Sequence, residues 1–249
     1  TDQVLGKIGK ALDMNEDSID ERVCLEDTFT NASQCKGASD IFDDPVSVRT
    51  VSLWYKADDV NTEFPQVLFE EGGESKGQVI YLFDNKIFAC TTKWTGECVS
   101  TTTTANEWHH VALVWASGTT SYLYHDGVQV ADFTGRDIPQ HNNPSALGNI
   151  AQKTRMAVDS DPDGGEFAYT DDTSSSFDGI IDEFRVTNTE LTSAEIQTMY
   201  NSESNDDFIK VGVVLSESIS FTDSISTAAG VNLSDTVSLT DSISKTAGV

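Results

Sequence analysis

Short apolar runs separated by glycine, aspartate and asparagine dominate the chain from about residue 22 to residue 201. The runs are rich in β-branched and aromatic residues, which favour β-strands. They are Val46–Tyr55, Val67–Phe69, Val79–Phe83, Ile87–Cys90 and Trp108–Trp115. Many short strands with turn residues between them are typical of two packed antiparallel sheets. The pattern therefore predicts an all-β sandwich over residues 22–201.

The segment Trp108–Trp115 alternates between two faces, because successive residues of a strand point in opposite directions. One face carries His109, Val111, Leu113 and Trp115, and the other carries Trp108, His110, Ala112 and Val114. Both faces are largely apolar, as in a strand deep within a sandwich.

A β-hairpin is predicted directly after this strand. Asp126-Gly127 separates the runs Tyr122–His125 and Val128–Val130. Aspartate followed by glycine tolerates the positive φ angles of a type I′ turn, which is the turn that joins adjacent antiparallel strands.

One helix is predicted near the end of the all-β region. Thr192 and Glu195 have the spacing of a capping box, and Leu191 and Ile196 occupy the positions of a hydrophobic staple. Met199-Tyr200 extends the apolar side of this helix. We therefore expect a short helix that ends near residue 201 and closes the domain.

Residues 1–21 differ from the sandwich that follows them. Val4, Leu5, Ile8 and Leu12 recur at helical spacing, although two glycines weaken a helix there. The segment is predicted to be either a short docked helix or an unanchored N-terminal arm.

Residues 202–249 contain two copies of one pattern. Leu215–Ser226 is echoed by Leu233–Ser244, at an offset of 18 residues. Apolar and acidic residues alternate with serine and threonine throughout each copy, so both copies predict β-strands. Strands with one apolar face need a sheet to join. They either join a neighbouring subunit, which would build a filament or layer, or fold back on their own domain.

The overall charge excludes two classes of partner. The chain has 249 residues, with 41 acidic and 15 basic side chains and a formal net charge of −26. Such a surface repels nucleic acids and anionic membranes. No apolar run approaches the roughly 20 residues that a membrane helix needs. No secretory signal stands at Thr1, so the chain is expected to be cytosolic or already processed.

The cysteines favour the processed alternative. Four cysteines form two close pairs, Cys24 with Cys35 and Cys90 with Cys98, and neither pair has the spacing of a zinc or redox motif. Two disulfides are the economical interpretation and indicate an oxidising, extracellular compartment. Four buried free thiols are the alternative. Asn31 and Asn232 begin glycosylation sequons, which also occur by chance.

Four segments and their order resemble the laminin-G-like, concanavalin-type jelly-roll family. They are Ser52–Tyr55, Asn106–Ala112, Tyr124–Gly127 and Phe177–Val186, and Leu191–Tyr200 supplies the family's short closing helix. The resemblance covers about residues 46–201. It implies two packed antiparallel sheets, and a protein that binds glycans, proteins or its own copies outside cells, frequently with calcium. The tail is similar to repeat arrays of large microbial surface proteins.

Catalysis is not expected. Glycosidases that share this fold carry Glu-x-Asp-x-x-Glu on one strand, and that spacing is not found in this sequence. A Gly-x-Ser-x-Gly nucleophile motif is also not found. His109 and His110 belong to the family's strand motif and are interpreted as structural.

A calcium site is predicted in an acidic loop. Asp159, Asp161 and Asp163 alternate along the chain, which lets one tight loop present three carboxylates to a hard cation. A carbonyl of Gly165 and the side chain of Asp171 are further candidate ligands. The alternative is a solvated acidic loop in a protein rich in aspartate.

Asp182 is a separate candidate. Alternation places it on the same face as Ile180, Phe184 and Val186, so a carboxylate is expected to face the core. A buried carboxylate must be hydrogen-bonded, paired or bound to metal. We expect it either to anchor backbone donors or to ligate a metal.

Two functions follow from these features. The first is a non-catalytic, extracellular, calcium-binding structural protein that forms homo-oligomers or a surface filament through residues 202–249. The second is a glycan- or protein-binding adhesion module on a repeat stalk, in which Trp94 of the Cys90–Cys98 loop stacks on a sugar.

Overall fold

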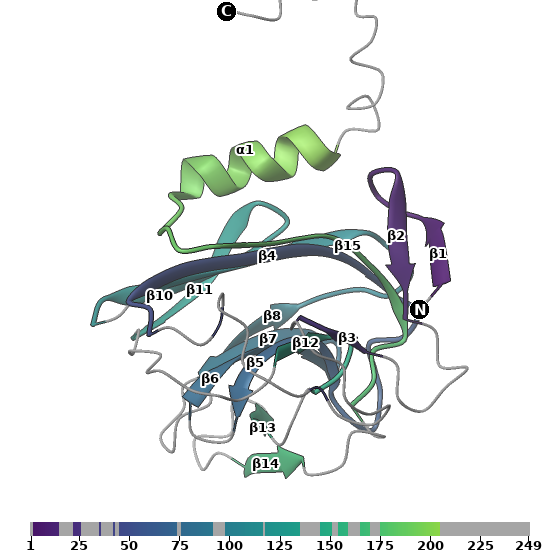
Figure 1. Cartoon of the computed structure of the whole chain (residues 1–249), viewed down its shortest axis with the longest axis horizontal. Coiled ribbons are helices and arrows are strands. Elements are labelled where there is room, and N and C mark those ends of the chain that lie inside the picture. The colour runs from purple at the N-terminus through teal and green to yellow at the C-terminus, as the bar shows by residue number, and fades with distance from the viewer. Residues whose placement is uncertain are drawn as a thin grey trace, which may run out of the picture. The chain divides into compact units, whose positions relative to one another are not determined.

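The computed structural model describes most of the domain predicted from the strand pattern (Figure 1). All described residues belong to the first of two units, Thr1–Phe208, and the second unit is Ile209–Val249. The described residues are 2–14, 22–25, 35, 42, 45–73, 76–91, 98–116, 118–134, 145–150, 154–158, 165–169 and 175–204.

Two antiparallel sheets form a jelly-roll sandwich, which confirms the predicted all-β fold. The seven-stranded sheet has the order β1 (Asp2–Leu5), β2 (Lys10–Asp13), β15 (Gly179–Thr187), β4 (Val48–Ala57), β9 (His109–Ala116), β10 (Thr120–His125) and β11 (Val128–Thr134). The six-stranded sheet has the order β3 (Val23–Cys24), β12 (Ser145–Leu147), β5 (Gln66–Gly73), β6 (Lys76–Phe83), β7 (Lys86–Thr91) and β8 (Cys98–Thr102). A separate pair consists of β13 (Thr154–Val158) and β14 (Gly165–Tyr169).

The core lies between the two large sheets, and strand β9 shows how the sequence builds it. Val111, Leu113 and Trp115 pack into the central cluster, as the alternation predicts. Ala112 and Val114 lie on the opposite face, against the closing helix. Complete burial of one such side chain contributes roughly 1.5–3 kcal/mol. Strand β9 is therefore stabilised on both faces.

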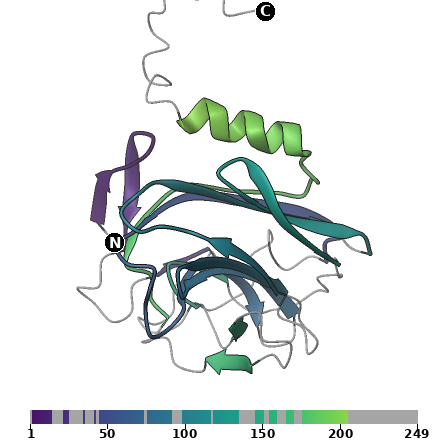
Figure 2. The ribbon, with the colours of Figure 1, turned by 180° about the vertical axis from the view of Figure 1, so that it is seen from behind.

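Helix α1 (Ser193–Ser204) covers the outer face of the seven-stranded sheet (Figure 2). The predicted capping box is confirmed: the Thr192 backbone N–H donates to Glu195 Oε2 at 2.8 Å, and the Glu195 N–H donates to Thr192 Oγ1 at 3.3 Å. Ile196 is fully buried, and Leu191 packs beside it. The helix runs to Ser204, so the expected boundary near residue 201 is wrong by about one turn. Within the described residues, no helix has the length and apolar character to cross a membrane.

The N-terminal segment is a β-hairpin, and both predictions for it, a helix and an unanchored arm, are wrong. Strand β1 pairs with β2, and β2 pairs with β15, where Leu12 lies opposite Ile181. Gly9 turns the chain with φ of 68°, and the Gly6 N–H donates to the Gly9 carbonyl at 3.1 Å. Docking at a sheet edge outweighs the weak helical spacing, because pairing with β15 stabilises the segment, whereas a short isolated helix with two glycines is only marginally stable.

Both predicted disulfides are confirmed. Cys24 bonds to Cys35, and Cys90 bonds to Cys98. Cys90 and Cys98 are directly opposite each other on β7 and β8, so the second bridge closes the loop between these strands. Each bridge stabilises the fold by roughly 2–3 kcal/mol, because it limits the freedom of the unfolded chain.

Candidate functional site

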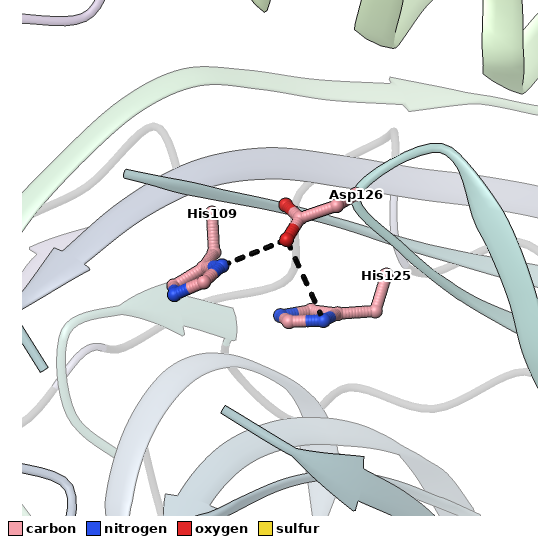
Figure 3. Close-up of side chains that lie close together, drawn as sticks. All are labelled: His109, His125 and Asp126. Carbon is pink, nitrogen blue, oxygen red and sulfur yellow. Dashed lines mark hydrogen bonds and ion pairs between the residues drawn. The ribbon is translucent and has the colours of Figure 1, made fainter. Parts of the chain in front are cut away.

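A cluster of two histidines and an aspartate lies at one end of the sandwich core (Figure 3). His109 begins β9, His125 ends β10, and Asp126 lies in the turn between β10 and β11. Asp126 and Gly127 have φ angles of 50° and 76°, which is the left-handed backbone expected of the predicted hairpin turn. Strand pairing places Tyr55 opposite His109, so its ring packs beside the cluster.

Asp126 holds the cluster together through both carboxylate oxygens. His109 Nδ1 lies 2.8 Å from Oδ2, and the backbone N–H of His110 donates to Oδ1 at 2.8 Å. Burial alone would raise the pKa of Asp126, but these hydrogen bonds outweigh it and lower that pKa below its usual value. The carboxylate is therefore ionised at neutral pH.

Hydroxyl groups hold the outer nitrogen of each imidazole. His109 Nε2 lies 2.8 Å from Thr104 Oγ1, and the Thr104 hydroxyl donates to Glu107 at 2.9 Å. His125 Nε2 lies 3.0 Å from the Tyr55 hydroxyl, which lies 2.6 Å from Thr103 Oγ1. Burial lowers the pKa of His125 to about 4 and raises the pKa of Tyr55, so both are neutral at pH 7.

The two histidines of the cluster are largely buried, and Asp126 is its most exposed member. The His109 and His125 side chains are 11% and 10% exposed, whereas that of Asp126 is 32% exposed. The two imidazole rings stack with centroids 4.9 Å apart. The Asp126 carboxylate is therefore the member of the cluster that solvent reaches most readily.

Asp182 lies on the helix-covered face of its sheet, and the expectation that it faces the core is wrong. A β-bulge follows Asp182, and Glu183 has a φ of 49°. The bulge reverses the alternation, so Phe184 joins the core face of Ile181. Asp182 accepts backbone N–H groups from Ile8 and Glu183, each at 2.8 Å. These bonds fit the anchoring role that the sequence left open.

A second polar group lies beneath helix α1. The Trp54 indole donates to Glu203 at 2.7 Å, and Arg185 pairs with the same carboxylate. Lys7 donates to the carbonyl of Ser204 at 3.0 Å and lies over the Trp54 ring. These contacts join the N-terminal hairpin to the end of the helix, and we infer that they stabilise the fold.

A polar cleft of about 440 Å³ lies beside the Cys90–Cys98 disulfide. Thr120, Asp132 and Thr134 are exposed along it, whereas Phe133 is buried. The lining residues are Cys98, Val99, Thr120, Asp132, Phe133 and Thr134. The lining is more polar than that of most small-molecule sites, and Phe133 supplies apolar surface.

Several predicted site residues lie outside the described residues, and their roles stay predictions. Of the calcium loop, only Gly165 is described, as the first residue of β14, directly opposite Val158 of β13. The acidic loop therefore connects two antiparallel strands. The remaining predicted residues outside the described part are Asp159, Asp161, Asp163, Asp171, Trp94, Asn31 and Asn232.

The histidine–aspartate cluster was not predicted as a site. The sequence identified the turn at Asp126 and the facing of His109, but interpreted the histidines as structural. One signal was present in the sequence: His125 directly precedes the predicted turn at Asp126, so these two members of the cluster are neighbours along the chain. The pairing of β9 with β10, which brings His109 to that turn, is a tertiary contact that the sequence pattern did not give.

The family assignment follows from sequence and fold together. A family model described as the concanavalin A-like lectin/glucanases superfamily, of the laminin-G type, matches residues 39–197. The chain belongs to this superfamily. No curated protein matches the chain in sequence.

Several solved structures share the fold at low sequence identity. Domain 4 of AbnA, an extracellular arabinanase of Geobacillus stearothermophilus solved with arabinotriose, is 20% identical over 80% of each chain, with a TM-score of 0.53. The binding domain of botulinum neurotoxin serotype G is 12% identical, with a TM-score of 0.55, over 82% of this chain and 46% of that domain. The binding domain of Paraclostridial Mosquitocidal Protein 1 is 16% identical, with a TM-score of 0.52, over 81% and 45%. This chain thus matches less than half the length of either toxin domain.

Proposed function

We propose that this chain is a non-catalytic extracellular module that binds carbohydrate in the cleft beside the Cys90–Cys98 disulfide. The cleft itself carries the proposal, because Cys98 lines it and also ends the loop that contains Trp94. Trp94 is four residues from Cys98 in the sequence, so the chain keeps its Cα within roughly 14 Å of the Cα of that cysteine.

The cleft suits a sugar on chemical grounds. Its volume falls within the roughly 300–1,000 Å³ that is usual for small-ligand sites. Asp132 and Thr120 offer an acceptor and a hydroxyl for sugar hydroxyl groups. An aromatic ring such as Trp94 can cover the apolar C–H face of a sugar ring. A pyranose or furanose unit needs both kinds of contact.

Two of the proteins that share the fold support a binding role. The arabinanase domain was solved with an oligosaccharide bound, and the toxin segments are named as binding domains. These likenesses concern the fold, so the ligand class for this chain rests on its own cleft.

The buried carboxylates on β5 support a non-catalytic role. Glu70 and Glu71 are adjacent, and successive strand residues point to opposite faces. Glu71 pairs with Arg49 and accepts a hydrogen bond from Gln78 at 2.9 Å. The two glutamates therefore do not face each other across a shared space, as a retaining glycosidase requires.

The extracellular location is part of the proposal, and the two disulfides support it, because such bonds persist in oxidising compartments. Calcium binding by the β13–β14 loop is a further element. Calcium at 100 times its dissociation constant would add about 2.7 kcal/mol to stability. Asp161→Asn should remove most of that gain, and a melting temperature insensitive to calcium would disprove the site.

Self-assembly is the second candidate function. Its support is the strict alternation within Leu215–Ser226 and Leu233–Ser244, whose apolar faces need a sheet to join. Deletion of 205–249 should abolish higher-order assembly in sedimentation experiments while the sandwich stays folded. Equal assembly of both forms would remove this function from consideration.

The carbohydrate proposal is tested on a panel of immobilised glycans, followed by calorimetry with the tightest oligosaccharide. Trp94→Ala and Asp132→Asn should each weaken binding at least tenfold, because each removes one kind of sugar contact. Asp84→Asn is the matched control, since Asp84 is exposed in the turn between β6 and β7. An assay for released reducing ends should show no hydrolysis. The proposal fails if the panel shows no ligand, or if both cleft variants bind as the wild type does.

A further inference from the structure

Three candidate ligand atoms lie close together in the histidine–aspartate cluster. They belong to His109, His125 and Asp126, and all three lie within 4.8 Å of one another. His125 Nδ1 is 3.8 Å from Asp126 Oδ2, which is too long for a hydrogen bond. Figure 3 shows that the three side chains point toward a common centre.

The surrounding hydroxyls stabilise the imidazole tautomers that a metal requires. Thr104 donates its proton to Glu107, so its oxygen can accept an N–H from His109 Nε2. The Tyr55 hydroxyl can likewise donate to Thr103 and accept from His125 Nε2. In the structure His109 Nδ1 donates to Asp126 Oδ2 at 2.8 Å, so a metal would displace that hydrogen bond; with both protons then on Nε2, both Nδ1 lone pairs would be available as ligands. Metal-binding histidines are usually oriented by such a partner on the second nitrogen.

A metal ion would join three atoms that a single proton cannot. The ionised Asp126 carboxylate accepts the proton of His109 Nδ1 at 2.8 Å. The His109–Asp126 hydrogen bond places one proton between these two residues, and that proton does not reach His125. A metal ion would contact all three atoms. The other carboxylate oxygen, Oδ1, is held by the His110 N–H, which orients the carboxylate, so Oδ2 would exchange its bond to His109 for a bond to the metal.

We propose that His109 Nδ1, His125 Nδ1 and Asp126 Oδ2 form a site for a divalent first-row transition metal, with zinc as the expected ion. Two imidazoles and one carboxylate suit zinc, whereas calcium prefers six to eight oxygens. Zinc bond lengths near 2.0 Å set tetrahedral ligand atoms roughly 3.3 Å apart. His125 must therefore move toward the other two ligands, whereas His109 Nδ1 and Asp126 Oδ2, which are 2.8 Å apart, must separate slightly. The exposed side leaves the fourth position to water or to a partner's ligand.

This site is separate from the cleft of the proposed function. His109 and His125 are at the ends of β9 and β10 that meet the Asp126 turn, whereas Thr120 of the cleft begins β10 at its other end. The metal inference therefore stands or falls independently of carbohydrate binding. The site is also distinct from the acidic loop predicted to bind calcium.

The test is calorimetric titration of the full chain with zinc chloride, after chelator treatment and with both disulfides intact. Millimolar calcium is kept in the buffer, because a chain with 41 acidic side chains attracts divalent cations non-specifically. All four cysteines are in disulfides, so thiolates do not contribute. We expect one saturable zinc site in the wild-type protein.

Three variants locate the site. His125→Asn and Asp126→Asn should each weaken zinc binding at least tenfold, since each removes one ligand. His141→Asn removes the histidine of the chain that lies outside both the cluster and the described residues, and it should bind zinc as the wild type does. Equal affinity in all four proteins, or no zinc binding in the presence of calcium, would overturn the proposal.

A second measurement keeps the proposal falsifiable if a variant fails to fold. The ¹⁵N chemical shifts of the wild-type imidazoles report which nitrogen holds the metal. Zinc should shift Nδ1 of His109 and of His125 and leave the ring of His110 unchanged. Shifts at Nε2 of these residues, or at His141 alone, would contradict the assigned geometry.

Discussion

His109 and His110 are neighbours in sequence but lie on opposite faces of one sheet. Their surroundings differ in hydrogen bonding and in exposure to solvent. His109 is bonded through both ring nitrogens and is partly open to solvent. His110 is fully buried between Trp54 and Tyr200, and among the described residues neither of its ring nitrogens has a hydrogen-bond partner. Burial lowers the pKa of His110 to about 4.

The contrast separates a group built for packing from a group available for binding. On the helix face, the imidazole of His110 acts as a flat ring that fills space, and its polarity is a cost. On the core face, partners on both nitrogens fix the orientation of His109, and 11% of its side chain stays exposed. Identical residues one position apart thus acquire different roles, because strand alternation sends them to different surroundings.

The largest expected effect is on the helix face. Ile196→Ala leaves a cavity between the helix and β9, so the free energy of unfolding should fall by roughly 2–5 kcal/mol in urea denaturation. Gln197→Ala, on the exposed side of the same helix, is the control and should change it by less than about 0.5 kcal/mol. Zinc affinity should stay the same in both variants. A coupled loss of zinc binding would mean that the two faces are not independent.

Acidification should also act mainly through the buried imidazoles. Between pH 6.5 and about pH 4 the unfolded chain binds a proton at His110 and the folded chain does not, so stability falls as the pH is lowered. Lowering the pKa of His110 from 6.5 to about 4 corresponds to a loss of roughly 3 kcal/mol in the free energy of unfolding at low pH. His125 contributes a loss of the same sign.

The His110 share of that loss can be isolated. His110→Phe keeps a ring in the cavity and removes the titrating group, so the slope of unfolding free energy against pH should fall by about half in chelator-treated protein. An unchanged slope would show that His110 is already protonated or exposed in the native state.

Asp126→Asn should cost about 2 kcal/mol at pH 7, because it removes a charge-assisted hydrogen bond to His109. Asparagine tolerates the positive φ of the turn, so the hairpin itself should persist. Asp84→Asn is matched in substitution and backbone, with φ of 48° in an exposed turn, and should be nearly neutral. Equal stability of the two variants by thermal melting would contradict the network drawn for Asp126.

The smallest effect is expected at the start of helix α1. Thr192→Ala removes the hydroxyl that accepts the Glu195 N–H, and should lower stability by about 1 kcal/mol. Thr198→Ala, in the exposed middle of the helix, is the comparison and should change stability much less. A larger cost at Thr198 than at Thr192 would argue against the capping box.

The sequence predicted those parts of the fold that depend on local pattern. The two faces of β9, the turn at Asp126-Gly127, the capping box and both disulfides each have a signal within a dozen residues. The N-terminal hairpin and the reversal of the alternation after Asp182 have no such local signal, because both depend on partners far along the chain. A bulge at Glu183 costs one residue of register, and counting by two cannot detect it.

The candidate sites also divide into those that a local sequence motif can indicate and those that depend on contacts between distant residues. The cleft combines residues from β8, β10 and β11, and the metal cluster combines the start of β9 with the end of β10 and the turn that follows it. Neither has a motif, since strand pairing assembles both. The predicted calcium loop is the opposite case, a contiguous motif whose carboxylates lie outside the described residues.

The most direct test of the binding-module account is a map of amide chemical shifts in ¹⁵N-labelled protein titrated with the tightest oligosaccharide. The account predicts saturable shifts that centre on Val99, Thr120 and Thr134, around the cleft. The amides of His109 and Asp126, at the opposite end of β9 and β10, should not move. Shifts centred on that end, or on neither end, would contradict the assignment of the cleft as the carbohydrate site.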